Sequence, residues 1–141
     1  MGIGLYFLRQ KQASSFYQIM NVLITGGAGF IGTHLTESCL MLDYKVTIID
    51  NFSEQIHGKT PILKRFSEAR YVVGDVCKIA DLKVALERSQ ADIVFHLAAE
   101  TGTAQSMEER ALHCNTNVLG TANLLDLIQK TPYRDWETEI S

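Results

Sequence analysis

Three glycines at regular spacing carry the clearest chemical signal in the sequence. They are Gly26, Gly29 and Gly32, in a segment that reads TGGAGFIG from residue 25 to residue 32. The first glycine permits a tight turn, the second lets backbone approach a pyrophosphate, and the third lets a helix pack closely on a strand. A helix that begins there offers free N–H groups and its positive dipole end to phosphates. The pattern therefore predicts a turn that binds a dinucleotide.

Two acids add to this prediction. Asp50 ends an apolar run 24 residues after Gly26, where a carboxylate accepts hydrogen bonds from ribose hydroxyls. An acid there repels a 2′-phosphate, so NAD is favoured over NADP. Asp75, in the sequence Gly74-Asp75-Val76, has two compatible interpretations: a contact with adenine, or the N-cap of a following helix.

The elements that must position these residues follow from the apolar pattern. Short apolar runs predict buried strands at 21–25, 45–50, 70–73 and 92–96. Helical spacing predicts helices over 30–42, 79–88 and 115–130, the last ended by Thr131–Pro132. A short helix is possible at 62–66, and Ser106 with Glu109 fits a capping box that would begin another.

The alternation of strands and helices predicts the α/β class. We expect a Rossmann-type doubly wound parallel sheet, truncated, with strand order 3-2-1-4. Residues 20–132 form the predicted NAD-binding half-domain. Met20 directly precedes the first strand, so residues 1–19 are interpreted as an extension with no role in the fold, and 133–141 as an irregular tail.

Composition excludes several classes of protein. The net charge of −3 argues against nucleic-acid binding, which needs a basic surface. The apolar run at 3–8 is too short to cross a bilayer, and its charges follow it, unlike those of a signal peptide. Cys39, Cys77 and Cys114 have no metal-binding or redox spacing. We therefore expect a cytoplasmic protein with buried or half-buried thiols, no metal and no membrane contact.

Five motifs resemble one family. TGGAGFIG (25–32), IIDN (48–51), GDV (74–76), HLAAETGTAQS (96–106) and NTNVLGTANLLD (115–126) look like those of extended short-chain dehydrogenases. More narrowly, the sequence over about 20–130 resembles the NAD-dependent nucleotide-sugar epimerases and dehydratases. The resemblance implies NAD as cofactor, a nucleotide sugar as substrate, and a helix that commonly builds a homodimer.

The resemblance also implies residue roles. Those implied at the pyrophosphate are Gly26, Gly29, Phe30, Ile31 and Gly32. Those implied at the adenosine are Asp50, Asn51, Asp75 and Val76. Those implied along the middle and nicotinamide end of the cofactor are Leu97, Ala98, Ala99, Thr101 and Asn117. Thr103 and Ser106 are implied to meet the sugar.

Several of these residues keep a second interpretation. Thr101 stands where galactose epimerases often have lysine, which weakens assignment to that enzyme. Ala98 and Ala99 fit tight backbone packing equally well, and Asn117 fits a bond to a neighbouring strand end. His96 is interpreted as a satisfied core histidine rather than a base. The other histidines show no partner pattern and receive no role.

The family's catalytic pair is missing from these residues. In the family a tyrosine deprotonates a sugar hydroxyl, and a lysine four residues later lowers the tyrosine's pKa. The five tyrosines here are followed at that spacing by Gln10, Asn21, Ile48, Asp75 and Glu137. We therefore expect cofactor binding without turnover. An uncovered 92–96 strand would invite self-association.

Three functional hypotheses remain open at this point. The first is the NAD-binding portion of a nucleotide-sugar epimerase or dehydratase, inactive alone. The second is a stand-alone NAD-binding module without catalysis. The third is an NADP-dependent reductase of the same superfamily, against which Asp50 argues.

Overall fold

A five-stranded sheet forms the centre of the computed structural model, which describes residues 4–7, 19–59 and 64–130. Four strands are parallel: β2 (Asn21–Thr25), β3 (Lys45–Asp50), β4 (Arg70–Val73) and β5 (Ile93–His96). Their order across the sheet is β5-β2-β3-β4. Numbered by their own sequence order, these strands give 3-2-1-4, so the predicted α/β Rossmann topology is confirmed.

An additional strand covers the edge of β5. Residues of β1 (Gly4–Phe7) pair with β5 in the antiparallel sense, Gly4 opposite His96 and Phe7 opposite Ile93. The prediction that residues 1–19 have no role in the fold is wrong for this segment, and so is the prediction of an uncovered edge. An edge strand needs only a few residues of backbone pairing, which the short apolar run supplies. The remaining boundaries, at 19/20 and 132/133, stay predictions.

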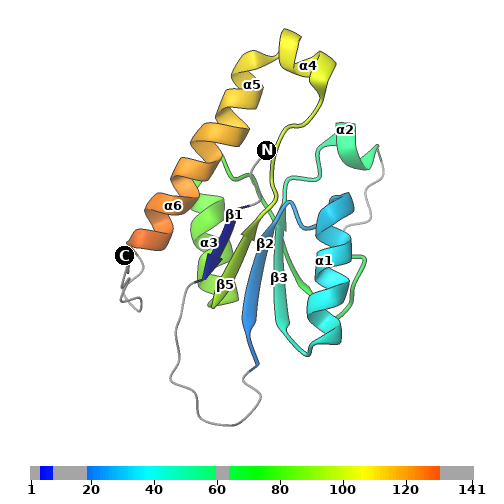
Figure 1. Ribbon diagram of the computed structural model, residues 1–141, viewed down its shortest axis with the longest axis vertical. Helices are drawn as coiled ribbons and strands as arrows, with labels where there is room; N and C mark the ends of the chain where they lie inside the picture. The colour runs from blue at the N-terminus through cyan, green and yellow to red at the C-terminus, as the bar shows by residue number, and fades with distance from the viewer. Residues whose placement is uncertain (1–3, 8–18, 60–63, 131–141) are drawn as a thin grey trace.

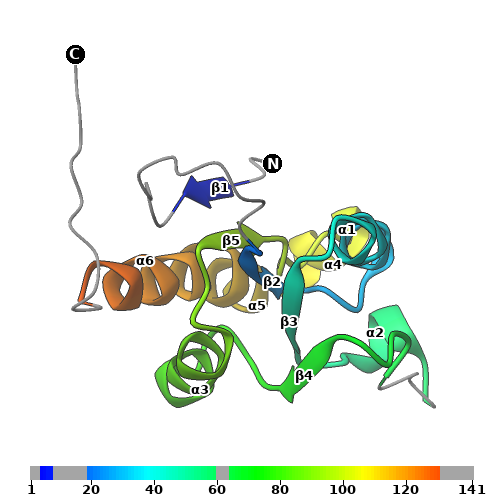
Figure 2. The same cartoon turned by 90° about the horizontal axis from the view of Figure 1, so that it is seen from below.

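Helices cover both faces of the sheet (Figures 1 and 2). On one face, α1 (Phe30–Met41) packs on a core that contains Val22, Ile24 and Ile48. On the other, α3 (Ile79–Ser89) and α6 (Thr121–Gln129) pack on Leu23 and Ile49. Successive β2 residues thus alternate between two buried cores, which explains why the strand is apolar throughout.

The long helical region differs from its prediction. It runs from α4 (Thr103–Glu108) through α5 (Arg110–Cys114), a π-helix η1 (Asn115–Gly120) and α6. Because α4 already begins at Thr103, Ser106 lies inside a helix and donates its N–H to the carbonyl of Gly102. The predicted helix start at Ser106 is therefore wrong. The predicted end at Pro132 lies outside the described residues.

The segment after β3 contains a helix that the sequence did not predict. This is α2 (Glu54–His57), only four residues long. The helix predicted at 62–66 is partly outside the described residues, and 64–66 are not helical. No helix in the described part of the chain is long and apolar enough to cross a bilayer.

Candidate functional site

The turn between β2 and α1 is a point of close backbone contact. Gly26 has a φ of +66°, and a Cβ there would lie 2.7 Å from the Ala98 backbone nitrogen. A Cβ on Gly32 would lie 2.5 Å from the carbonyl oxygen of Gly26. No side chain larger than hydrogen fits at either position without moving backbone. The turn, the start of α1 and the loop after β5 are therefore held together through glycine.

The first turn of α1 has no side chain that would neutralise the positive end of the helix dipole. Its N-cap is Gly29, no side chain caps it, and its first turn contains no acid. The N–H groups of Phe30, Ile31 and Gly32 precede the first helical bond, which Thr33 donates to the carbonyl of Gly29 at 2.9 Å. A helix start of this kind attracts an anion such as a phosphate.

A cavity of about 740 Å³ opens beside this turn, at the carboxyl ends of the parallel strands. Every residue predicted to contact the cofactor lines it: Gly26, Gly29, Phe30, Ile31, Gly32, Asp50, Asn51, Asp75, Val76, Leu97, Ala98, Ala99, Thr101 and Asn117. Thus four strand ends and the long helix bring the predicted residues together around one space.

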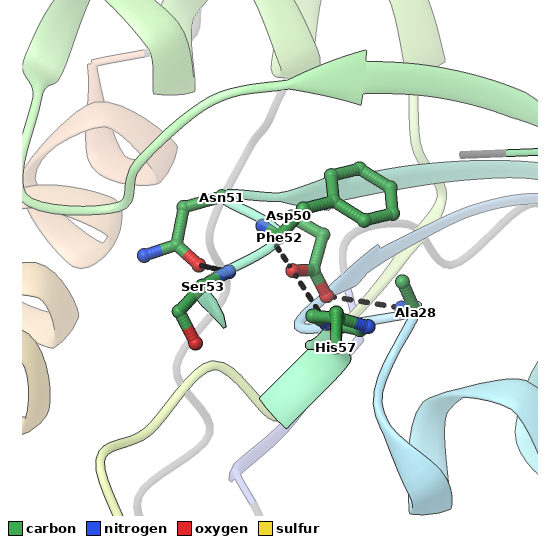
Figure 3. Close-up of polar contacts among 6 residues, drawn as sticks. All are labelled: Ala28, Asp50, Asn51, Phe52, Ser53 and His57. Carbon is green, nitrogen blue, oxygen red and sulfur yellow. Dashed lines mark hydrogen bonds and ion pairs between the residues drawn. The ribbon is translucent and has the colours of Figure 1, made fainter. Parts of the chain in front are cut away.

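Asp50 is fixed at one end of this cavity (Figure 3). Its Oδ2 accepts the Ala28 N–H at 3.0 Å, and its Oδ1 accepts the Phe52 N–H at 2.9 Å. Asp50 is 7% exposed, and His57 Nε2 lies 3.4 Å from its Oδ1. The carboxylate therefore links the glycine-rich turn to β3 and keeps lone pairs for a ligand.

Asp75 occupies the turn after β4. Its Oδ1 accepts the Cys77 N–H at 2.8 Å, while its own N–H is donated to Asp81 Oδ2 at 2.9 Å. The N-cap of α3 is Lys78, so Asp75 orders the preceding turn rather than the helix itself. Its position in the cavity wall is compatible with the adenine contact that the resemblance implies.

His96 connects β2 to the long helix through a series of hydrogen bonds whose donors and acceptors can be assigned. Thr25 Oγ1 accepts the N–H groups of Leu97 and Ala98 at 3.1 and 3.2 Å, so its proton points to His96 Nδ1, 2.6 Å away. His96 Nε2 then donates to Thr121 Oγ1 at 2.9 Å, and Thr121 donates to the carbonyl of Asn117. The network assigns a neutral imidazole with its proton on Nε2. This agrees with the interpretation of His96 as a satisfied core histidine.

We predict that this network makes stability depend on pH. Burial lowers the pKa of His96 below its usual value, so the unfolded chain binds a proton before the folded chain does. Stability is complete above about pH 6.5, the ordinary histidine value, and is lost as the pH falls below it. Urea unfolding at several pH values should show a decline in acid that is smaller in His96→Gln. An equal decline in both proteins would contradict the assignment.

Asn117, in the π-helix, holds the loop after β5 in place. Its Oδ1 accepts the Glu100 N–H at 2.8 Å, and its Nδ2 donates to the Glu100 carbonyl at 2.9 Å. The π turn also places Thr116 and Thr121, five residues apart, on the same cavity wall. Gly120 permits this packing, since a Cβ there would lie 2.7 Å from Val76 Cγ2.

Asn117→Asp should loosen this loop with almost no change in shape. The carboxylate keeps an acceptor for the Glu100 N–H but places an oxygen against the Glu100 carbonyl, where a donor stood. We expect a loss of about 1–3 kcal/mol in the free energy of unfolding. The exposed Asn115→Asp change is the matched control, and an equal loss in both would contradict the role given to Asn117.

Sequence reasoning missed part of the wall. The unpredicted lining residues are Ile49, Ser53, Ile56, His57, Gly74, His96, Glu100, Thr116 and Thr121. Thr116 and Thr121 are five residues apart, and in an ordinary α-helix two residues at that spacing point to different faces. Nothing in the sequence therefore places both in one wall. His57 has no sequence signal, because its position depends on how residues 51–57 fold back over Asp50.

Of the two residues predicted to meet the sugar, the structure describes only the side chain of Ser106. Thr103 begins α4, and its side chain lies outside the described part of the structure. Ser106 lies within α4 and is not among the lining residues. Their substrate role stays a prediction.

Among the described residues no cluster of His, Cys, Asp and Glu could hold a metal. Of the thiols, Cys39 is buried and Cys77 half-buried, whereas Cys114 is exposed.

Comparison with known proteins places this geometry in context. The model of the NAD dependent epimerase/dehydratase family matches residues 22–136. The dTDP-L-rhamnose 4-epimerase of Burkholderia thailandensis is 40% identical over 111 residues, which are 77% of this chain and 30% of that protein. The UDP-N-acetyl-alpha-D-glucosaminuronate decarboxylase of Bacillus cytotoxicus is 38% identical over 116 residues, 77% of this chain and 32% of that protein.

The fold is also similar to solved structures. The UDP-glucose 4-epimerase of Thermus thermophilus, crystallised in complex with NAD, gives a TM-score of 0.68 at 30% identity. The match covers 76% of this chain and 33% of that one. The chain thus spans about a third of the length of the relatives it matches.

Proposed function

The chain belongs to the NAD dependent epimerase/dehydratase family. From this premise we propose that its cavity binds NAD, and that the chain is the cofactor-binding portion of a nucleotide-sugar-modifying enzyme. The observation that carries the proposal is the pairing of two features in one cavity. The uncapped start of α1 lies at one wall, and the fixed Asp50 carboxylate lies at another. A dinucleotide needs both, one for its diphosphate and one for its ribose.

The chain's own residues would each perform a defined task. The N–H groups at the start of α1 would hold the diphosphate, which would approach the backbone at Gly29. Gly26 and Gly32 would let the turn, the helix and the loop after β5 pack closely beside it. Asp50 would accept the adenosine ribose hydroxyls, with Asn51 beside it, while Asp75 and Val76 would flank the adenine. NAD, when bound, supplies the hydride acceptor for oxidation of a sugar carbon.

The nicotinamide end would lie along the loop after β5. Leu97, Ala98 and Ala99 line the cavity there, the two alanines with small side chains, and Asn117 fixes the loop through Glu100. Thr101 lies in the same wall. The neutral His96 orders this loop through Thr25 and takes no part in proton transfer under this proposal.

The proposed substrate is a nucleotide sugar. The relatives include epimerases and a decarboxylase that are named for dTDP- and UDP-linked sugars. No tyrosine in these 141 residues has a lysine four positions later. We therefore propose that the chain binds NAD without turning over a sugar unless that pair is supplied to the site. Self-association also stays a proposal, and the open-edge reason for it no longer applies because β1 covers β5.

The proposal is tested by calorimetric titration of the chain with NAD and with NADP near neutral pH. We expect one saturable NAD site and weaker NADP binding, because Asp50 repels a 2′-phosphate. In parallel, UDP-glucose and NAD incubated with the chain should give no NADH and no epimerised sugar. Absence of saturable NAD binding at millimolar concentration, or binding of NADP more tightly than NAD, would overturn the proposal.

A further inference from the structure

The charged groups in the cavity are almost all acidic. The described lining contains Asp50, Asp75 and Glu100, and it contains no lysine or arginine. Two histidines also line it. His96 is held neutral between Thr25 and Thr121, because protonation would remove the acceptor that Thr25 needs. His57 is thus the one side chain in the described lining left to supply a positive charge.

His57 lies directly against Asp50, the carboxylate proposed to bind the ribose (Figure 3). Its Nε2 is 3.4 Å from Asp50 Oδ1, and its side chain is 12% exposed. Its ring packs on Phe52, with ring centroids 5.2 Å apart. Phe52 is itself buried and has a φ of +51°, which turns the chain so that α2 returns over Asp50.

Asp50 cannot move away from this contact. Two backbone N–H groups, of Ala28 and Phe52, hold its two oxygens. Among the described residues the ion pair joins His57 to Asp50 alone. The acid on α2 itself is Glu54, and Asp75 and Glu100 lie elsewhere in the cavity wall. The net charge beside the ribose site therefore changes from negative to neutral when His57 takes up a proton.

We propose that His57 is a specificity-determining residue for the cofactor: protonated, it neutralises Asp50 and weakens the preference for NAD over NADP. This inference rests on the proposed NAD site. An acid at this position excludes NADP by repelling its 2′-phosphate, and a cation nearby accommodates that phosphate. The neutral and the protonated imidazole, 3.4 Å from Asp50, would therefore give the 2′-phosphate two different environments.

The test compares dissociation constants for NAD and NADP at about pH 8 and about pH 6, a range over which histidines ordinarily change charge. In the unmodified chain the NAD preference should fall about tenfold at the lower pH, as expected for one charge near a phosphate at a partly exposed site. The 2′-phosphate also titrates in this range, so some fall is independent of the protein. In His57→Gln only that smaller part, about two- to threefold, should remain.

His34→Gln is the matched control, since His34 is an exposed histidine outside the cavity lining. It should behave as the unmodified chain does. An equal fall in His57→Gln and the unmodified chain would overturn the inference while leaving NAD binding intact. Failure of NAD to bind at either pH would instead overturn the proposed function.

A second measurement avoids substitution altogether. If His57 charge favours NADP, then NADP must favour the charged ring to the same extent, by thermodynamic linkage. The ring resonances of His57 should keep the imidazolium position to a higher pH in the NADP complex than in the NAD complex. Identical ring titrations in the two complexes would contradict the proposal even if His57→Gln fails to fold.

Discussion

Gly32→Ala should cost the chain a large part of its stability. The new Cβ would lie 2.5 Å from the Gly26 oxygen and 2.5 Å from Gly27 Cα. Both atoms are backbone, so the methyl group fits only if α1 moves off the turn. We expect a loss of about 2–4 kcal/mol in the free energy of unfolding, a large part of what a small domain has. Urea unfolding followed by circular dichroism measures it.

Gly58→Ala is the control for this substitution. Gly58, unlike Gly32, has a positive φ, +68°, and a Cβ there meets nothing within 4 Å. The cost of Gly58→Ala should therefore be limited to backbone strain, about 1–3 kcal/mol. Where enough folded Gly32→Ala remains to titrate, its NAD affinity should also fall, whereas Gly58→Ala should keep it. A loss of NAD affinity in Gly58→Ala as large as that in Gly32→Ala would mean that close packing of α1 on the turn is not the cause.

Asp50→Asn should remove most NAD binding while leaving the fold largely in place. The amide keeps one oxygen for the Ala28 or Phe52 N–H, but it loses the charge that would strengthen bonds from ribose hydroxyls. Hydrogen bonds to a charged group contribute about 1.5–3 kcal/mol each, so we expect NAD affinity to fall at least about tenfold. NADP affinity should fall less or rise, since the repulsion is gone. Calorimetric titration with both cofactors measures the two effects.

The control for this loss of charge is Asp43→Asn. Asp43 is exposed, lies outside the cavity lining, and has a φ of +59°, a conformation that asparagine tolerates. NAD affinity should be unchanged there. Unchanged NAD affinity in Asp50→Asn would contradict the assignment of Asp50 to the ribose, whatever else binds in the cavity.

The sheet was predictable because its strands depend on local pattern. The central strands β2 and β3 are buried on both faces, so runs such as Val22–Ile24 are apolar without interruption. The glycine-rich turn was equally clear from its spacing, and at Gly26 and Gly32 the neighbouring backbone leaves no room for a Cβ. Asp50 followed from its position at a strand end. These features bring the predicted cofactor residues around one cavity, and they could be predicted with no knowledge of distant contacts.

The features that were missed depend on distant contacts. The pairing of Gly4–Phe7 with β5 joins segments far apart in the chain, and nothing local in a four-residue run requires it. The π-helix arises where Gly120 packs on Val76, a contact between separate elements. His57 reaches Asp50 only because Phe52 adopts a positive φ, which the residue type does not indicate.

The most direct test of the NAD site is an amide-resolved NMR titration of the chain with NAD. We predict the largest saturable shifts at the N–H groups of Gly29, Phe30, Ile31 and Gly32, with a second group at Asp50 and Asn51. Amides near the end of α3, such as Arg88, should not move. Shifts that are absent at millimolar NAD, or that fall away from both the α1 start and the end of β3, would contradict the account.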